Sequence, residues 1–291
     1  MKYHVDGDLL PADEASVSVR DRGFRYGDAA FETLRAYGGS IFEWDAHEAR
    51  LRRTADLLGF ADWVPDDLRE RVRGTLATND LHEAYVRLSV TRGAGAGRLA
   101  PASAVDPTVV VIVEELPRGG LAGESVWDGP ATVQTVKTRA VPDAAMPSDA
   151  KTHNYLNGVL ARIELQRAAN EEYRADEALL RDGEGTLTEG ATSNVFFVEE
   201  GTLKTPSTDG ALLPGITRSV VLDLAADEEF PVETGRYTTA DVREADEAFL
   251  TNTTWELRPI ARADGVAVGG GPVTQLLARL FDERVERVQY E

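Results

Sequence analysis

The chain has four lysines, and lysine is the side chain that forms imines with carbonyl compounds. Arginine carries nearly all the other positive charge and forms no imine, because it stays protonated at neutral pH. Lys2 sits at a terminus, Lys204 follows a turn, and Lys137 lies in an expected strand. Lys151 stands between MPSDA and HNYLNGVL, just before an expected helix start. By position alone, Lys151 is explained equally well as a surface lysine.

Other residue patterns suggest anion binding. The segment PGIT, residues 214–217, places proline and glycine before an apolar helical pattern, and the free N–H groups at a helix start favour a phosphate. Tyr85 and Arg87 share the polar face of one expected strand, and an arginine can bind a carboxylate through two hydrogen bonds. Glu189, taken alone, is a strand-end glutamate in an acid-rich protein.

Hydrophobic periodicity predicts mixed strands and helices to position these side chains. Alternation over 84–91 predicts a strand with Ala84, Val86, Leu88 and Val90 on one face. The apolar run over 108–113 suits a strand buried on both faces. Asn154 is an expected cap of the helix that follows Lys151. A short strand and a turn around Asp6 and Gly7 are expected within 4–10. Other strands are expected within 31–37 and near 131–138, 177–181, 194–198 and 248–251, with helices near 45–58, 68–76 and 154–163, from 215, and near 276–285.

The composition excludes several classes of protein. With 42% hydrophobic and 28% charged residues among 291, the chain is an ordinary globular protein. No run approaches the roughly 18 apolar residues of a membrane helix, and the N-terminus has no apolar signal core, so we expect a cytoplasmic protein. A net charge of −19 repels nucleic acid and anionic membranes. The lack of cysteine excludes disulfides and thiolate metal sites, and we expect no metal.

An acidic surface poor in lysine favours a halophilic origin, because salt screens the repulsion between like charges. The alternative is a mildly acidic protein from a GC-rich genome.

Six motifs occur in one order along the chain: RDRGFRYGDAAFETLRAY, AHEARL, KTHNYLNGVLA, TEGATSNVFF, LPGITR and FLTNTTWEL. Together they resemble the class IV aminotransferases, also called fold type IV pyridoxal-phosphate enzymes, over nearly the whole chain. This family includes branched-chain aminotransferase, D-amino acid aminotransferase and aminodeoxychorismate lyase. The resemblance implies a mixed α/β (α+β) fold with a smaller N-terminal α/β domain and a larger C-terminal α/β domain that has a barrel-like sheet. It also implies pyridoxal 5′-phosphate as cofactor, amino acid and 2-oxo acid substrates, and a homodimer whose active site the partner subunit completes.

The domain boundary is expected at LPRGGLAGES, residues 116–125, where a proline and three glycines cluster. We therefore place the N-terminal α/β domain at 1–117, the interdomain linker at 118–125 and the C-terminal cofactor-binding domain at 126–291.

The resemblance also implies the cofactor contacts. Lys151 matches the lysine that forms the Schiff base and moves the α-proton. Glu189 matches the glutamate that faces the pyridine nitrogen and keeps it protonated, which makes the ring an electron sink. The other implied cofactor contacts are Arg50, Ile216, Thr217 and Thr253 at the phosphate, Tyr155 near the ring hydroxyl, and Asn194. Without the resemblance, Arg50 would be one more surface arginine and Tyr155 a packing residue.

Substrate contacts follow from the same matches. Tyr26 and Phe31 match aromatics that line the pocket, Tyr85 and Arg87 match a tyrosine and an arginine of the branched-chain group, and Thr254 would offer a backbone contact to the substrate carboxylate. The implied set is Tyr26, Phe31, Tyr85, Arg87, Arg98, Thr254 and Trp255. Each of these residues has a structural role as its alternative.

The motifs divide between the branches of the family. HNYLNGVLARIE and AYVRLSVTRG look most like the branched-chain branch, and Tyr155 argues against the lyase, which usually has a basic residue there. RGAGAGR, which ends at Arg98, also resembles the lyase, and Trp255 departs from the small residue usual in the branched-chain group. We rank branched-chain-like transfer from an L-amino acid to a 2-oxo acid such as 2-oxoglutarate first. Aminodeoxychorismate lyase, which forms 4-aminobenzoate and pyruvate, is second, and D-amino acid transamination third. A non-catalytic relative is disfavoured, since it would need neither Lys151 nor Glu189.

Overall fold

The computed structural model describes residues 1–95, 98–102, 105–121, 123–170 and 174–291. The chain divides into two compact units. Unit 1 comprises Met1–Arg118, Ala150–Asn154 and Val285–Glu291, and unit 2 comprises Gly119–Asp149 and Tyr155–Arg284. The short segment that carries Lys151, residues 150–154, therefore belongs to the N-terminal unit. The predicted domains are continuous in sequence and place this segment in the C-terminal domain. Residues 96 and 97 of the RGAGAGR stretch and residue 122 of the predicted linker lie outside the described residues.

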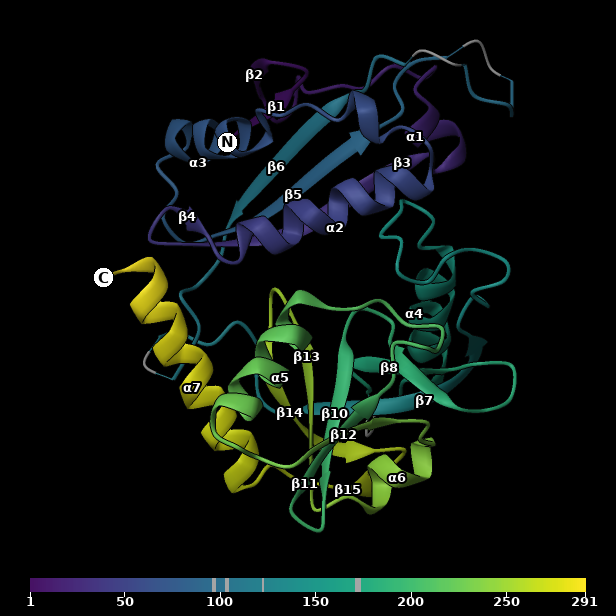
Figure 1. Ribbon diagram of the computed structural model, residues 1–291, viewed down its shortest axis with the longest axis vertical. Coiled ribbons are helices and arrows are strands. Elements are labelled where there is room, and N and C mark those ends of the chain that lie inside the picture. Colours follow the sequence, from purple (N-terminus) through teal and green to yellow (C-terminus); the bar gives the residue numbers. More distant parts are fainter. Residues whose placement is uncertain (96–97, 103–104, 122, 171–173) are drawn as a thin grey trace. The chain divides into compact units, whose positions relative to one another are not determined.

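Unit 1 is built on an antiparallel sheet with the strand order β2-β1-β6-β5-β3-β4 (Figure 1). Its strands are β1 (Lys2–Val5), β2 (Asp8–Pro11), β3 (Ala29–Tyr37), β4 (Ser40–Ile41), β5 (Ala84–Thr91) and β6 (Val109–Glu115). Its helices are α1 (Arg22–Tyr26), α2 (Trp44–Leu57), η1 (Ala61–Trp63) and α3 (Leu68–Thr78).

The helices α2 and α3 cover one face of this sheet. The alternation predicted over 84–91 is confirmed, because the four even-numbered apolar residues of β5 are buried in one core with side chains of α2 and α3. Ala30 and Leu34 of β3 belong to the same core. Since successive side chains alternate, Phe31 on β3 and Arg87 on β5 point to the other face.

The expectation that residues 108–113 are buried on both faces is wrong. In β6, Val109, Val111 and Val113 are buried, whereas Val110 and Ile112 are half-buried. The reason is the same one-sided packing, since the helices cover one face of the sheet.

Unit 2 contains a larger, mixed sheet with the order β12-β11-β10-β13-β14-β7-β8-β9, and β15 pairs with β14. Its strands are β7 (Ala131–Arg139), β8 (Glu177–Arg181), β9 (Leu187–Gly190), β10 (Asn194–Glu199), β11 (Thr202–Pro206), β12 (Val232–Gly235), β13 (Glu247–Asn252), β14 (Glu256–Ala263) and β15 (Val266–Ala267). The helices that begin in this unit are α4 (Leu156–Ala168), α5 (Ile216–Asp227), α6 (Thr239–Glu244) and α7 (Pro272–Gln289). These two sheets confirm the predicted mixed α/β fold.

The large sheet curls so that its two ends meet. The strands β12 and β9 stand at opposite ends of the strand order. The N–H of Leu187 in β9 nevertheless donates to the carbonyl oxygen of Tyr237, two residues beyond β12, at 2.8 Å. This contact agrees with the barrel-like sheet that the family resemblance implies.

Asn154 is not the cap of α4, contrary to the sequence prediction. The helix α4 begins at Leu156, and its capping position is Tyr155, whose side chain accepts no capping hydrogen bond. The Asn154 side chain instead donates to the carbonyl oxygen of Gly27 at 3.2 Å. Within the described ranges, no helix is long and apolar enough to span a membrane.

Candidate active site

Lys151 lies on a short strand-like segment that pairs with the beginning of β3. The Phe31 N–H donates to the Lys151 carbonyl oxygen at 3.0 Å, and the His153 N–H donates to that of Ala29 at 3.2 Å. The Lys151 N–H donates to the Thr54 hydroxyl of α2 at 3.0 Å. The backbone at Lys151 is therefore held by one strand and one helix, whatever the side chain does.

The Phe31 side chain organises the sheet face on which Lys151 lies. The Arg87 guanidinium carbon lies 4.0 Å from the centre of the Phe31 ring, and the Lys151 Nζ lies 4.6 Å from it. Both contacts are in the range of cation–π attraction. The structure thus brings together three residues predicted from the sequence, and half-buried Tyr85 lies on the same face two positions before Arg87.

Arg50 is buried and ion-paired, and is not a surface arginine. Its Nε donates to Glu32 Oε1 at 2.8 Å and its Nη2 to Oε2 at 2.6 Å. His47 Nδ1 lies 2.8 Å from the same Oε2 and must donate, because a carboxylate only accepts. All three side chains are at most 4% exposed. Glu32 therefore fixes the orientation of the Arg50 guanidinium.

The charge states of this cluster follow from burial and pairing. Burial alone would raise the pKa of Glu32, but the Arg50 charge and the hydrogen bonds from Arg50 and His47 lower it to about 2. Burial lowers the pKa of His47, although its hydrogen bond to Glu32 opposes that change. At neutral pH the cluster is thus an ion pair with a neutral imidazole beside it.

Tyr26 and Arg98, both predicted at the substrate, are linked through buried Arg22. Arg22 donates to the carbonyl oxygens of Arg98 at 2.7 Å and Leu99 at 2.9 Å, and its Nε donates to Asp28 at 2.7 Å. The same guanidinium lies 5.0 Å from the centre of the Tyr26 ring. The sequence analysis did not single out Arg22, which fixes the backbone at Arg98.

Unit 2 brings Glu189, Asn194 and the start of α5 together. Glu189 Oε2 accepts a hydrogen bond from the Leu213 N–H at 3.1 Å and one from Asn194 Nδ2 at 3.4 Å. Asn194 Nδ2 also donates to the Leu213 carbonyl oxygen at 3.0 Å. The half-buried carboxylate is therefore tied to the loop that leads into α5.

The first turn of α5 is suited to bind an anion. Gly215 is its capping residue, and it has no side chain that could accept a hydrogen bond from the helix start. A Cβ at Gly215 would lie 2.1 Å from Asn194 Oδ1, so a side chain there would displace Asn194. Backbone N–H groups left without a capping side chain favour a phosphate. Ile216 and Thr217, both predicted at the phosphate, form this turn.

The loop after β13 carries Thr253, Thr254 and Trp255. Asn252 Oδ1 accepts hydrogen bonds from the N–H groups of Thr254 at 3.0 Å and Trp255 at 2.7 Å. The Thr254 N–H is thus already hydrogen-bonded. The Trp255 ring lies 5.2 Å from the Arg258 guanidinium carbon and packs on the core of unit 2. Just before this loop, the buried Thr251 hydroxyl has no partner among the described residues.

Tyr155 is the capping residue of α4, and its ring lies beside Gly158, where a Cβ would be 3.7 Å from Tyr155 Cδ1. The predicted site residues therefore form two groups. Lys151, Phe31, Tyr85, Arg87, Arg50, Tyr26 and Arg98 lie in unit 1, and Tyr155, Glu189, Asn194, Ile216, Thr217, Thr253, Thr254 and Trp255 lie in unit 2. Within the described part of the chain, no three His, Asp or Glu side chains cluster as metal ligands.

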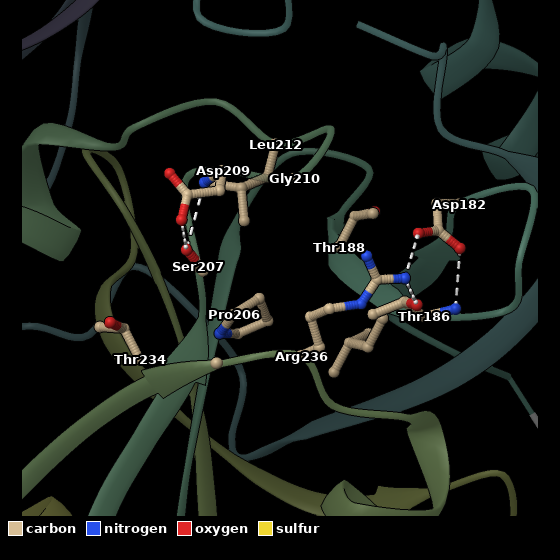
Figure 2. Close-up of a pocket in the computed structure, with 12 residues that line it drawn as sticks. Asp182, Thr186, Thr188, Pro206, Ser207, Asp209, Gly210, Leu212, Thr234 and Arg236 are labelled. Carbon is tan, nitrogen blue, oxygen red and sulfur yellow. Dashed lines mark hydrogen bonds and ion pairs between the residues drawn. The ribbon is translucent and has the colours of Figure 1, made fainter.

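Unit 2 also contains a cavity of about 250 Å³ that no predicted site residue lines. Figure 2 shows Ser207 and Asp209 paired on one wall, with Arg236 reaching Thr186 and Asp182 on the other. Leu187 and Thr188 of β9 also line it. The charged side chains of the cavity are already paired, Arg236 with Asp182 and Asp209 with the Ser207 hydroxyl.

Comparison with known proteins identifies the family. The model of the class IV aminotransferases matches residues 29–263, and the chain belongs to this family. A putative branched-chain-amino-acid aminotransferase of Methanocaldococcus jannaschii is 37% identical over 97% of this chain and 95% of its own length. A D-alanine aminotransferase of Listeria monocytogenes is 32% identical over 99% of this chain and 97% of its own.

Two solved structures show the same fold. The branched-chain aminotransferase of the archaeon Thermoproteus uzoniensis, solved with norvaline, has a TM-score of 0.87 and 28% identity, covering 100% of this chain and 96% of its own. The 4-amino-4-deoxychorismate lyase of Pseudomonas aeruginosa has a TM-score of 0.82 and 28% identity, covering 99% and 100%. Class IV aminotransferases use pyridoxal 5′-phosphate.

The Glu32–Arg50 pair should be a large contribution to stability. We expect Glu32→Gln to lower the free energy of unfolding at pH 7 by about 3–5 kcal/mol, because it leaves a buried guanidinium without its counter-charge. The pKa of Glu32 is lowered from 4.5 to about 2, so its contribution is present above pH 4.5 and lost as the pH falls toward 2. The difference in the free energy of unfolding between Glu32→Gln and wild type should therefore become smaller as the pH falls from 4.5 toward 2.

Urea denaturation at several pH values measures both effects. The control is Glu283→Gln, which removes an exposed pair with Arg279 and should cost about 1 kcal/mol or less. Equal stability losses in the two variants would contradict the role given to Glu32.

Proposed function

We propose that the chain is a pyridoxal-phosphate-dependent aminotransferase that moves an amino group from an L-amino acid, branched-chain-like in type, to a 2-oxo acid such as 2-oxoglutarate. The observation that carries this proposal is the position of Lys151. Its backbone is fixed by β3 and α2, and its amine lies 4.6 Å from the centre of the Phe31 ring, beside Arg87. An amine held on a rigid strand can be aimed at one carbon atom of a bound substrate.

The cofactor, when bound, supplies an electron sink that stabilises negative charge at the substrate α-carbon. Lys151 would hold the cofactor covalently through Nζ. Once the amino group of the substrate has displaced Nζ from the cofactor, the freed amine would take the α-proton from the substrate as a general base. As a general acid, it would then return a proton to the cofactor carbon to which it had been bound.

Each part of this cofactor is assigned to residues that the family resemblance implies. Its phosphate fits the uncapped first turn of α5, with Ile216 and Thr217 as donors, and Arg50 and Thr253 are proposed as further contacts. Glu189 would face the pyridine nitrogen and keep it protonated. The hydrogen bonds from Leu213 and Asn194 would hold this carboxylate in place.

Substrate binding is proposed at Arg87 and its neighbours. Arg87 is half-buried, and among the described residues it has no hydrogen-bond or ion-pair partner. A half-buried guanidinium in a protein of net charge −19 is suited to bind a substrate carboxylate. Tyr26, Phe31, Tyr85, Thr254 and Trp255 are proposed as further substrate contacts, as the family resemblance implies.

The lyase reaction is the second candidate, and Arg98 favours it. Arg22 fixes the backbone at Arg98, in a stretch that resembles the lyase, and the lyase of P. aeruginosa shares the fold. D-amino acid transamination is the third candidate, supported by the relative in L. monocytogenes.

A homodimer is also proposed. Leu156, Val159 and Leu160 of α4 are 68%, 49% and 49% exposed, and this spacing places them on one side of the helix. An exposed apolar stripe of this kind is typical of a contact with another protein, and the family resemblance makes a second copy the expected partner.

We expect Lys151→Ala to fold but to lose turnover, because the backbone hydrogen bonds that join this segment to β3 and α2 do not require the lysine side chain. Borohydride reduction of the wild-type holoenzyme followed by peptide mapping should place the cofactor on the Lys151 peptide. Lys137→Ala, which changes an exposed lysine, is the control and should keep both label and activity. A label on Lys137 or Lys204 would overturn the assignment.

We expect Glu189→Gln to bind the cofactor but to lower kcat by roughly a hundredfold, with a smaller change in KM. Glutamine is nearly isosteric and can still accept from Leu213, but it carries no charge to hold a proton on the pyridine nitrogen. Steady-state kinetics measure the effect, with exposed Glu184→Gln as the control. Unchanged kcat in Glu189→Gln would rule out the role of this carboxylate.

The reaction type is tested by mixing the holoenzyme with one amino acid and no acceptor. Aminotransfer should bleach the visible band of the cofactor with L-leucine or L-glutamate and release the matching 2-oxo acid in one equivalent. Bleaching with D-alanine in their place would favour the D-specific reaction. If no amino acid has this effect and aminodeoxychorismate gives pyruvate and 4-aminobenzoate, the lyase reaction is the correct one.

We expect the double variant Val159→Asp, Leu160→Asp to sediment as a monomer, because two charges would have to be buried in the contact. Sedimentation velocity compares it with wild type and with Arg73→Asp, a change on an exposed residue of α3. A wild-type protein that sediments as a monomer would refute the homodimer.

A further inference from the structure

His153 lies two residues beyond Lys151, on the same sheet face. Its ring is edge-on to that of Phe31, with the ring centres 5.5 Å apart. Its Nε2 lies 3.1 Å from the hydroxyl of Ser89, which is 6% exposed. His153 thus joins the group of Phe31, Arg87 and Lys151, although the sequence analysis gave it no role.

The His153 imidazole is neutral at physiological pH. Burial and then the Arg87 charge lower the pKa of His153 to about 4, and Asp21 opposes this change. The Lys151 amine and this imidazole both contact the Phe31 ring. A neutral imidazole has one N–H donor and one acceptor nitrogen, so the Ser89 contact decides which nitrogen carries the proton.

The Ser89 hydroxyl selects the tautomer. Among the described residues, its hydrogen-bond partner is His153 Nε2, and a buried hydroxyl needs an acceptor for its hydrogen. If Ser89 donates to Nε2, then His153 carries its proton on Nδ1. This Nδ1 has no hydrogen-bond partner among the described residues and is not one of their buried unpartnered atoms, so it reaches solvent.

We propose that His153 determines substrate specificity. Its Nδ1–H group donates a hydrogen bond to an oxygen atom at the end of the substrate side chain, and the contact with Ser89 orients this group. Beside the branched-chain-like donors, the site then also binds amino and 2-oxo acids whose side chain ends in a carboxylate or a carboxamide, the class to which 2-oxoglutarate belongs. This inference rests on the proposed function, because it places the substrate beside Lys151. Arg87 adds a positive charge that favours a carboxylate over a carboxamide.

The kinetic test compares L-glutamate with L-leucine. We expect His153→Leu to lower kcat/KM for L-glutamate by roughly three- to tenfold or more, the effect of losing one hydrogen bond, and to leave L-leucine unchanged or improved. His153→Asn keeps a side-chain N–H donor and should restore part of the preference. Ser89→Ala, which leaves the tautomer unfixed, should cause a smaller loss. His82→Leu, which changes an exposed histidine, is the control.

A second test does not depend on turnover. The chain has four histidines, so ring resonances of labelled protein can be assigned by single substitutions. At pH 7 we expect the nitrogen shifts of His153 to show the Nδ1–H tautomer, and Ser89→Ala to show a mixture. Glutarate, a dicarboxylate without an amino group, should shift the His153 signals, whereas 4-methylpentanoate should not.

The proposal is wrong if L-glutamate and L-leucine lose activity in parallel in His153→Leu, or if glutarate leaves the His153 signals unmoved. If wild type transfers no amino group at all, the proposed function fails, and the response to glutarate still decides the role of His153. Should His153→Leu not fold, Ser89→Ala and His153→Asn provide the comparison.

Discussion

The backbone hydrogen bonds between β3 and the segment around Lys151 are the constraint on which the candidate site depends. They join residues 29–31 to residues 151–153, which lie more than a hundred positions apart in sequence. Because Lys151 and His153 are two residues apart on this strand-like segment, both side chains point to the same face. That pairing also brings Phe31 beside them, so the positions of the amine, the aromatic ring and the imidazole all follow from one register.

The two faces of β3 have different electrostatic characters. Glu32 points toward α2, where it neutralises Arg50 inside the core. Phe31 points the opposite way, and there the cations of Arg87 and Lys151 face an aromatic ring and no carboxylate is paired with Arg87 among the residues that the structure describes. On the core face Glu32 thus neutralises Arg50, whereas on the other face the charge of Arg87 has no paired carboxylate among the described residues. In a strongly acidic protein, such a cation attracts anionic ligands to one place.

Much of the fold and part of the site could be predicted from the sequence. The alternation over 84–91 predicted which side chains of β5 lie on the core face and which lie on the other face. The motif around Lys151 indicated this lysine as the residue on which the proposed function rests. The prediction for 108–113 was wrong, because an apolar run does not reveal that helices cover one face. His153 was missed because its role depends on a contact with Ser89, 64 positions away. Glu32 offered a signal that went unused, since a charged residue on the core-facing side of the FETLRAY strand requires a buried partner.

The curl of the large sheet has a consequence for solubility. Exposed strand edges promote aggregation, and proteins often protect them with lysines. This chain has four lysines, and its acidic charges repel less strongly when salt screens them. Its terminal strands β9 and β12 have four residues each. The hydrogen bond from the Leu187 N–H to the carbonyl oxygen of Tyr237, two residues beyond β12, joins the two edges. Backbone closure thus gives the sheet a protection against self-association that does not weaken as the ionic strength rises.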